Sequence, residues 1–243
     1  MQYWGLTDKG MVRNENQDTF FAGTVQSPSG EATLCVVCDG MGGARAGGLA
    51  SSTACGTFAD TVKHGFAAGA GLEALMVEAA RAANEAVLRK AGESTEYRGM
   101  GTTLVAAAIC GDEAVVANVG DSRCYIIENG GIRQITRDHS LVEDMVDKGE
   151  LTREQAWKHP RKNLITRAVG TESSVDCDIF STVLGEGSYM LLCSDGLSNI
   201  VNSQEMLFEV LYGGSIDTAA QRMMDIALGR NASDNVTVVL LAR

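Results

Sequence analysis

Residues 35–43 read CVVCDGMGG, and this stretch indicates both the type of fold and the place of a site. Its apolar first half is typical of a buried β-strand, which stops at Asp39 and gives way to a glycine-rich turn. A carboxylate fixed at a strand end, beside backbone that other groups can approach closely, is well suited to bind a hard metal ion. Asp121 and Asp195 also lie next to glycines, so a metal site forms if these acids converge.

Length and composition indicate one soluble globular domain over residues 1–243. The chain has 45% hydrophobic and 21% charged residues, and no linker rich in Pro, Gly or Ser divides it. No apolar run approaches the roughly 18 residues that cross a bilayer. The first residues have neither the basic start nor the apolar core of a secretory signal. We therefore expect a monomeric cytoplasmic protein with no membrane partner.

Charge and cysteine content exclude further classes of protein. The formal net charge of −11 argues against a nucleic-acid partner, because phosphate binding needs a basic face. It fits a site rich in carboxylates, although an acidic surface would give the same total. Cys35 and Cys38 form a C-x-x-C inside an apolar run, and no second such pair completes a zinc site. We expect these two residues to be reduced and packed in the core.

The expected strands fall in blocks, with helices grouped between them. Strands are predicted at residues 3–6, 19–22, 32–38, 102–109, 113–119, 123–128, 132–136, 176–180, 189–194 and 235–242, and helices at 48–67, 72–91, 140–148, 152–157, 203–211 and 217–228. Short breaks at 111–112, 120–121 and 129–131 predict antiparallel hairpins, because parallel neighbours need long crossovers. This order favours an α+β fold with antiparallel sheets over a doubly wound parallel sheet.

Five aspartates stand at predicted strand ends or strand starts: Asp18, Asp39, Asp121, Asp195 and Asp234. A single aspartate in such a place is usually a turn residue, but the repeated setting favours a shared site. If the strands before Asp39 and Asp195 are neighbours, their acids meet at one edge of a sheet. Clustered carboxylates raise each other's pKa, and a divalent cation relieves that cost.

Oxygen ligands without clustered His or Cys favour magnesium or manganese over zinc or copper. Two such ions sharing one carboxylate would activate water and support an in-line phosphoryl displacement. Asp39 is the candidate for the shared ligand, and the peptide carbonyl of Gly40 is a further one. Arg13 lies in the polar loop that leads to Asp18, where a guanidinium can hold a phosphate through two hydrogen bonds. A surface arginine is the equal alternative.

The chain resembles the metal-dependent Ser/Thr protein phosphatases of type 2C, the PPM family, in their compact bacterial form. The resemblance lies in seven segments that follow in order along nearly the whole chain: residues 13–18 (RNENQD), 37–43 (VCDGMGG), 101–103 (GTT), 118–123 (NVGDSR), 136–140 (TRDHS), 193–197 (CSDGL) and 233–237 (SDNVT). It implies a four-layer αββα sandwich of two antiparallel sheets flanked by helices, with a binuclear centre in a cleft at one end.

The resemblance also implies roles for individual residues. Asp39 would bridge the two metals and Gly40 would supply its carbonyl, while Asp195 and Asp234 would complete the second ion's ligands. Asp18 would bind through water held by the metal.

Two further implications concern the phosphate and a third ion. Arg13 would grip the substrate phosphate. A weaker third ion would fall near Asp121 and Asp195, and Asn163 could approach it from a flap at about residues 141–166.

The implied function is a Mg²⁺- or Mn²⁺-dependent phosphoprotein phosphatase that attacks phosphoserine or phosphothreonine with metal-activated water and forms no phosphoenzyme. Its partners would be phosphorylated proteins and a cognate Ser/Thr kinase that it opposes. Two alternatives stay open: a metallohydrolase of small phosphoesters, and a pseudophosphatase that only binds. Gln17 replaces the Glu of many relatives. Met41 stands where eukaryotic members place a proposed acidic His, so the general acid is unassigned.

Overall fold

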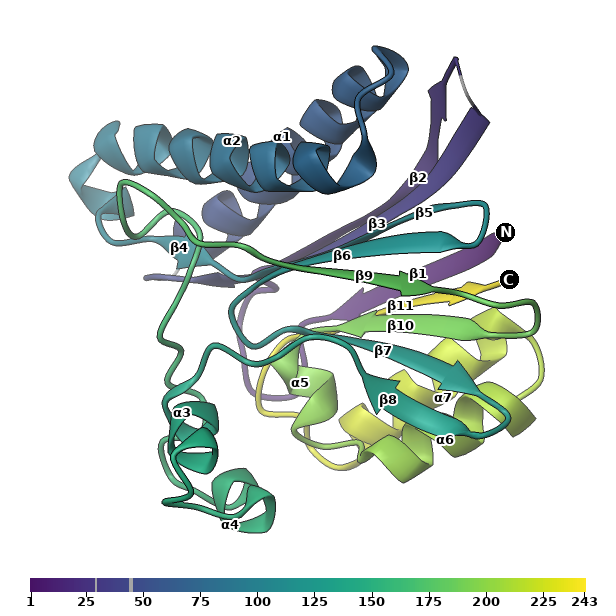
Figure 1. Ribbon diagram of the computed structural model, residues 1–243. Helices are drawn as coiled ribbons and strands as arrows, with labels where there is room; N and C mark the ends of the chain where they lie inside the picture. Colours follow the sequence, from purple (N-terminus) through teal and green to yellow (C-terminus); the bar gives the residue numbers. More distant parts are fainter. Residues whose placement is uncertain (29, 44–45) are drawn as a thin grey trace.

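The computed structural model describes residues 1–28, 30–43 and 46–243. Two antiparallel β-sheets pack face to face, and helices cover the outer face of each sheet (Figure 1). The predicted αββα sandwich is therefore confirmed. Among the described residues, no helix is both long enough and apolar enough to cross a bilayer.

Both sheets draw their strands from distant parts of the sequence. The larger sheet has the order β2-β3-β5-β6-β9, with the short β4 beside β3. Its strands are β2 (Asp18–Ser27), β3 (Gly30–Met41), β4 (Gly101–Thr102), β5 (Leu104–Cys110), β6 (Glu113–Val119) and β9 (Asp178–Val183). The smaller sheet has the order β1-β11-β10-β7-β8. Its strands are β1 (Gln2–Asp8), β7 (Arg123–Glu128), β8 (Gly131–Gln134), β10 (Tyr189–Cys193) and β11 (Val236–Ala242).

The helices form two outer layers and a separate flap. The long helices α1 (Ala46–Ala67) and α2 (Leu72–Gly92) cover the larger sheet, and a short 3₁₀ turn (Thr95–Tyr97) follows them. The smaller sheet is covered by α5 (Asp195–Ser198), α6 (Ser203–Tyr212) and α7 (Ile216–Gly229). The helices α3 (Leu141–Asp147) and α4 (Arg153–Trp157) stand off the sandwich, in the segment predicted as a flap (Figure 1).

Strand β3 is buried on both faces, which explains why it is apolar at successive positions. Leu34 and Val36 pack toward α1 and α2, whereas Cys35 and Val37 pack against the second sheet. A strand covered on both faces cannot alternate apolar with polar residues. Cys35 and Cys38 are free thiols in this core, as predicted.

The hairpin predicted at residues 120–121 is wrong. β6 belongs to the larger sheet and β7 to the smaller one, so the chain crosses between the sheets there. A break of two or three residues permits either connection, and only the packing of the flanking strands decides between them. The hairpins predicted at 111–112 and 129–131 are confirmed, because β5 pairs with β6 and β7 with β8. Asp121 therefore lies where the chain passes from one sheet to the other.

The strands that lead to Asp39 and Asp195 are not neighbours in one sheet, so the condition under which the acids would share a sheet edge is not met. β3 lies inside the larger sheet and β10 inside the smaller one. The two sheets pack face to face, and β3 and β10 end at the same end of the sandwich. Asp39 and Asp195 therefore meet there and not at the edge of one sheet.

Candidate metal centre

The predicted acids gather at one end of the sandwich. A cavity of about 210 Å³ is lined by four of them, Asp39, Asp121, Asp195 and Asp234. Asp39 lies in β3 of the larger sheet, and Asp121 lies in the crossover that follows β6. Asp195 follows β10 and Asp234 precedes β11, and these two strands pair in the smaller sheet. The cavity therefore exists only because both sheets end at the same level. Arg13, Gly40, Met41 and Asn163 also line it.

Asp18 lies beside this cavity without lining it. It stands directly opposite Asp39 in the β2–β3 ladder and is only 7% exposed. Its Oδ2 accepts hydrogen bonds from Ser194 Oγ (2.8 Å) and Thr237 Oγ1 (2.7 Å). Its Oδ1 is buried and has no hydrogen-bond partner among the described residues. The carboxylate is thus fixed on one side and unsatisfied on the other, which is costly unless a further ligand is present.

Ser194 and Thr237 are functional positions that sequence reasoning missed. Ser194 precedes Asp195, and Thr237 belongs to the segment after Asp234, so proximity to predicted ligands was the available signal. Their hydroxyls reach Asp18 across the gap between the two sheets. Nothing in the local sequence identifies that contact.

Asp39 is held through its backbone. Its N–H donates to Thr103 Oγ1 (2.9 Å), and its carbonyl accepts from Thr102 Oγ1 (2.8 Å) and from the N–H of Thr103 (2.9 Å). These bonds leave the side-chain carboxylate free to face the cavity. Residues 101–103, which the family resemblance singled out, therefore fix the position of Asp39.

Both Asp-Gly pairs need glycine for close backbone approach. A Cβ on Gly40 would lie 2.1 Å from the carbonyl oxygen of Gly47, and one on Gly196 would lie 2.0 Å from that of Asn235. Any side chain there would push the preceding aspartate out of place. Gly40 and Gly196 thus determine the positions of the Asp39 and Asp195 side chains in the site.

Asp18, Asp39, Asp121 and Asp195 have strongly perturbed pKa values. Burial, followed by repulsion from neighbouring carboxylates, raises the pKa of Asp39 and that of Asp121 well above the ordinary range. Burial also raises the pKa of Asp18 and that of Asp195 to about 6. Protein hydrogen bonds offset only part of this penalty. A divalent cation would favour the charged forms of all these groups.

The donor atoms fit hard divalent ions. Asp195 Oδ2 accepts from Asn199 Nδ2 (2.9 Å), but its Oδ1, like that of Asp18, is buried without a partner among the described residues. No three His, Cys, Asp or Glu side chains within residues 1–28, 30–43 and 46–243 stand close enough to enclose an ion by themselves. An ion held here would therefore keep several waters, which is typical of Mg²⁺ and Mn²⁺ and not of a closed zinc site.

Arg13 and Gln17 lie at the mouth of the cavity. Arg13 Nη2 donates to Asp234 Oδ2 at 2.7 Å, and its side chain is 55% exposed. Gln17 binds through its backbone, donating its N–H to Asn235 Oδ1 and accepting from the N–H of Gly40. Its amide nitrogen donates to the carbonyl of Gly43 at 3.4 Å, so this side chain supports the glycine-rich turn.

His139 has a structural position. It is 2% exposed, and its Nδ1 accepts the N–H of Gly120 at 3.0 Å. Its proton must then sit on Nε2, which faces Asp178 Oδ2 at 3.1 Å. Burial lowers the pKa of the imidazole. His139 is therefore a neutral anchor for the loop that carries Asp121, and it does not reach the cavity.

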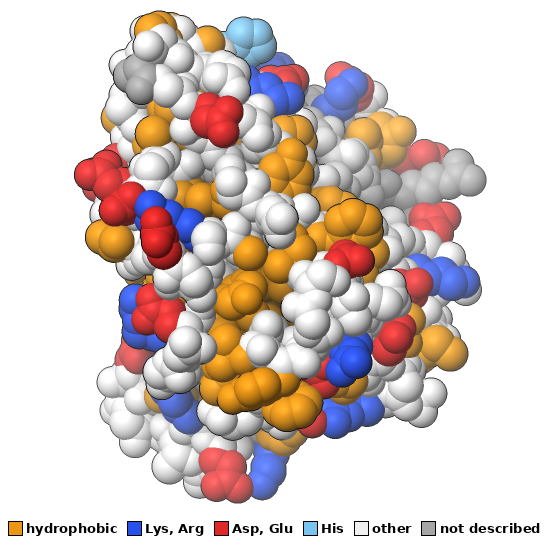
Figure 2. All heavy atoms as spheres, turned by 90° about the vertical axis from the view of Figure 1, so that its right-hand side faces the viewer, with side chains coloured by type: hydrophobic (Ala, Val, Ile, Leu, Met, Phe, Trp, Pro, Cys, Tyr) orange, Lys and Arg blue, Asp and Glu red, His pale blue; other side chains and the backbone are white. Residues whose placement is uncertain are grey.

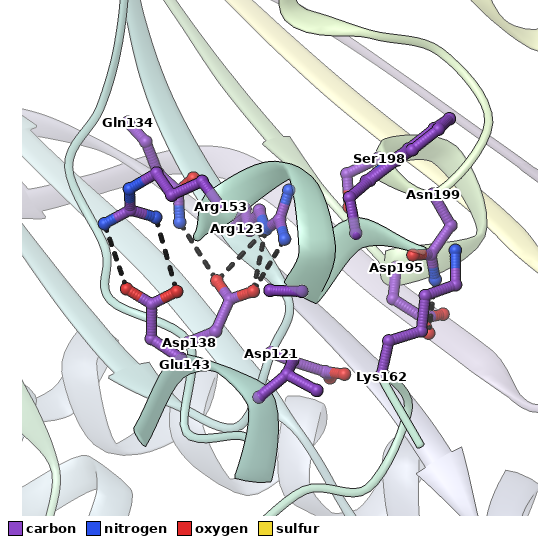
Figure 3. Close-up of a pocket in the computed structure, with 13 residues that line it drawn as sticks. Asp121, Arg123, Gln134, Asp138, Glu143, Arg153, Lys162, Asp195, Ser198 and Asn199 are labelled. Atoms are coloured by element: carbon purple, nitrogen blue, oxygen red, sulfur yellow. Dashed lines mark hydrogen bonds and ion pairs between the residues drawn. The ribbon is translucent and has the colours of Figure 1, made fainter. Parts of the chain in front are cut away.

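A second cavity of about 190 Å³ lies between the acids and the flap, and it shares Asp121 and Asp195 with the first. Figure 3 shows its charged residues largely paired: Arg123 and Gln134 bind Asp138, and Arg153 binds Glu143. Lys162 extends beside Asp195, and burial lowers the pKa of its ammonium group against the opposing effect of that carboxylate. The second cavity thus lies next to the acids at Asp121 and Asp195 and is lined on its other side by residues of α4.

Comparisons with known proteins find relatives that share this chain's sequence pattern and fold. Residues 12–230 match the family Protein phosphatase 2C. The serine/threonine phosphatase stp of Listeria monocytogenes is 37% identical over 98% of this chain and 94% of its own length. A crystal structure of the Mycobacterium tuberculosis serine/threonine phosphatase PstP/Ppp superposes with a TM-score of 0.90 at 34% identity, covering 100% of this chain and 99% of that one. The PstP catalytic domain in complex with 2 manganese ions gives a TM-score of 0.86 at 33% identity, covering 98% and 96%.

Proposed function

The chain belongs to the protein phosphatase 2C family, and from that membership we propose that it is a metal-dependent phosphatase that removes phosphate from phosphoserine and phosphothreonine in proteins. One observation carries the proposal. Four carboxylates from two sheets line one small cavity, and burial and mutual repulsion penalise the charge of Asp39, Asp121 and Asp195. Such an arrangement is stabilised by divalent cations, and a metal-bound relative of the same fold holds two manganese ions.

We assign the ions to the oxygen donors of the cavity. Asp39, the carbonyl of Gly40, Asp195 and Asp234 would hold the ions, and Asp39 would be the shared ligand. Asp18 would add its unsatisfied Oδ1 through water held by a metal. When bound, such ions lower the pKa of water and stabilise charge on a phosphoryl group.

The protein's own contribution is to hold these groups still. The Thr102 and Thr103 hydroxyls fix the backbone of Asp39, and the Ser194 and Thr237 hydroxyls fix Asp18. Preorganised ligands need no rearrangement when charge develops during the reaction. Arg13, at the mouth, is placed to bind a phosphate oxygen while it also neutralises Asp234.

A third, weaker ion is proposed near Asp121. Asp121 and Asn163 both line the cavity, and Asp195 contributes to the raised pKa of Asp121. The leaving alkoxide has no histidine to protonate it, because none of His64, His139 and His159 lines either cavity. Met41 lines the cavity but carries no proton. We therefore assign no side chain as general acid.

As substrates we propose phosphorylated proteins, including products of a Ser/Thr kinase, with residues 1–243 acting as one catalytic domain. The support is the likeness to relatives named as protein phosphatases and the second cavity, which gives room for residues that flank a phosphorylated side chain.

The test is phosphate release from a phosphothreonine peptide and from p-nitrophenyl phosphate, with Mn²⁺ and with a chelator. We expect release only with the metal, full recovery when Mn²⁺ replaces the chelator, and a higher kcat/KM for the peptide. Folded protein without metal-dependent release would overturn the proposal. A higher kcat/KM for the small ester would assign the site to small phosphoesters instead.

A further inference from the structure

The end of the sandwich remote from the acids carries an apolar groove. β6 runs from Glu113, at this end, to Val119, next to the crossover that holds Asp121, so the two ends lie about 20 Å apart along the strand. The groove has a volume of about 1030 Å³ and is lined by the turn between α1 and α2, the β5–β6 hairpin and β9. We call this region the hairpin end.

Apolar side chains from both layers line the groove: Phe66, Leu72 and Val77 from the helices, and Val115, Ile179 and Val183 from the sheet. Val77 is 47% exposed and Val183 is 63% exposed. Figure 2 looks onto this side of the molecule and shows hydrophobic side chains gathered in a hollow near its centre. The helical layer thus covers part of β9, where Ile179 packs against the core, but it leaves Val183 at the end of this strand exposed.

β9 borders the groove with one open backbone edge. Among the described residues it pairs with β6 alone, and the N–H of Leu184 donates to the carbonyl of Asp112 just beyond the paired residues. Backbone groups in an antiparallel ladder alternate in direction, so those of Ile179, Ser181 and Val183 point away from β6. The side chains of the same three residues line the groove.

The edge of β9 lacks the features that usually block strand addition. Edge strands are normally protected by Lys, Pro, a bulge or very short length. β8, an edge of the other sheet, has four residues and carries Arg133. β9 has six residues, DIFSTV, with neither Lys nor Pro. The charged residues that line the groove are Glu73 and Glu113, without any Lys or Arg among the described residues there.

We propose that the hairpin end binds an extended segment of a partner protein that adds a strand to β9. The segment would form main-chain hydrogen bonds with Ile179, Ser181 and Val183 and place alternate apolar side chains in the groove. Lys or Arg at its ends would pair with Glu73 and Glu113, because the rim is acidic. This inference is independent of the phosphatase reaction at the opposite end.

The test uses random 12-residue peptides displayed on phage and selected on the wild-type protein. We expect enrichment of sequences in which apolar residues alternate and Lys or Arg flank them. A synthetic, fluorescently labelled peptide of the enriched sequence then gives dissociation constants by anisotropy.

Two variants of the protein test the backbone edge and the acidic rim separately. Val183→Pro removes a backbone N–H that points away from β6, at an exposed edge position where proline is tolerated. The double variant E73K/E113K reverses the charge of the rim. Asp225→Lys on α7 reverses a single acidic charge on the opposite helical layer, as each substitution of the double variant does at the rim.

We expect about tenfold weaker binding by each groove variant and unchanged binding by Asp225→Lys. If Val183→Pro alters the thermal unfolding temperature, methylation of alternate backbone nitrogens in the peptide tests the same hydrogen bonds on the unmodified protein. The proposal is overturned if no sequence is enriched, if the enriched apolar residues have helical spacing, or if loss of the backbone donors leaves the affinity unchanged.

Discussion

The two ends of the β-sandwich leave different interactions unsatisfied. At the acid end, which holds Asp39 and Asp195, strands from both sheets terminate in half-buried carboxylates that lack enough counter-charge. At the hairpin end, Ile179 and Val183 present apolar side chains and a backbone edge that no described strand pairs with. The first arrangement favours a bound cation, and the second offers the edge to which we propose that a partner strand adds. The two ends lie apart by the length of the strands.

The largest effect is expected from Asp39→Asn. Loss of the shared ligand should lower kcat/KM by about a thousandfold, because the ions supply several kcal/mol of charge stabilisation. The same variant removes a buried and repelled charge, so without metal its free energy of unfolding should rise. Phosphate release and urea unfolding measure the two effects, with the exposed Asp225→Asn as matched control. Near-normal activity, or a fall in metal-free stability, would contradict the bridging role.

The metal-free protein should lose stability as pH rises. The pKa values of Asp18 and Asp195 are about 6, whereas an unfolded aspartate has a pKa of 3.8. Between these values the folded state binds more protons than the unfolded chain, so its free energy of unfolding falls with increasing pH. Saturating Mn²⁺ should reverse the trend, since it binds the charged form.

Urea unfolding at pH 5 and pH 7.5, with chelator and with Mn²⁺, measures this dependence. Asp195→Asn removes one of the responsible groups, so its metal-free stability should fall less over the same interval. If the free energy of unfolding falls equally in the variant and the wild type, Asp195 does not cause the pH dependence.

The sequence predicts where the strands of the acid end stop, but it does not predict which sheet each strand joins. Apolar runs that stop at Asp39 and Asp195 correctly predicted strand ends. The break at residues 120–121 was predicted as a hairpin, because local pattern does not record which sheet the next strand joins. For the same reason, the contact of Thr237 with Asp18, 219 positions apart, was not foreseen.

The hairpin end could not be predicted at all. Its free edge depends on β9 having one neighbour, and its groove depends on where α2 stops covering the sheet. Neither fact has a signal in residues 178–183, which read as an ordinary half-buried strand. The open edge and the groove both depend on which elements do not pack there, and only the folded structure shows this.

Arg13→Ala should raise KM by about tenfold and lower kcat by less. Arg13 is the basic residue among those that line the acid cavity, and hydrogen bonds to charged groups are worth about 1.5–3 kcal/mol. Arg13→Lys should recover part of the loss, because an ammonium keeps the charge but not the paired geometry. Steady-state kinetics with the phosphothreonine peptide provide the measurement, and an unchanged KM would count against phosphate binding by this residue.

The smallest effect, and the most direct comparison of the two ends, comes from a pair of threonines. Thr237→Val removes one of two hydroxyls that bind the buried Asp18 carboxylate, so the free energy of unfolding should fall by about 2 kcal/mol in Mn²⁺ at pH 7.5. It should also raise the pKa of Asp18 further, because this hydrogen bond lowers it. Thr182→Val on β9 removes a hydroxyl that makes no hydrogen bond within the described residues and should change stability by less than about 0.5 kcal/mol. If both variants lose the same free energy of unfolding, the hydrogen bond from Thr237 to the Asp18 carboxylate contributes no special stability at the acid end.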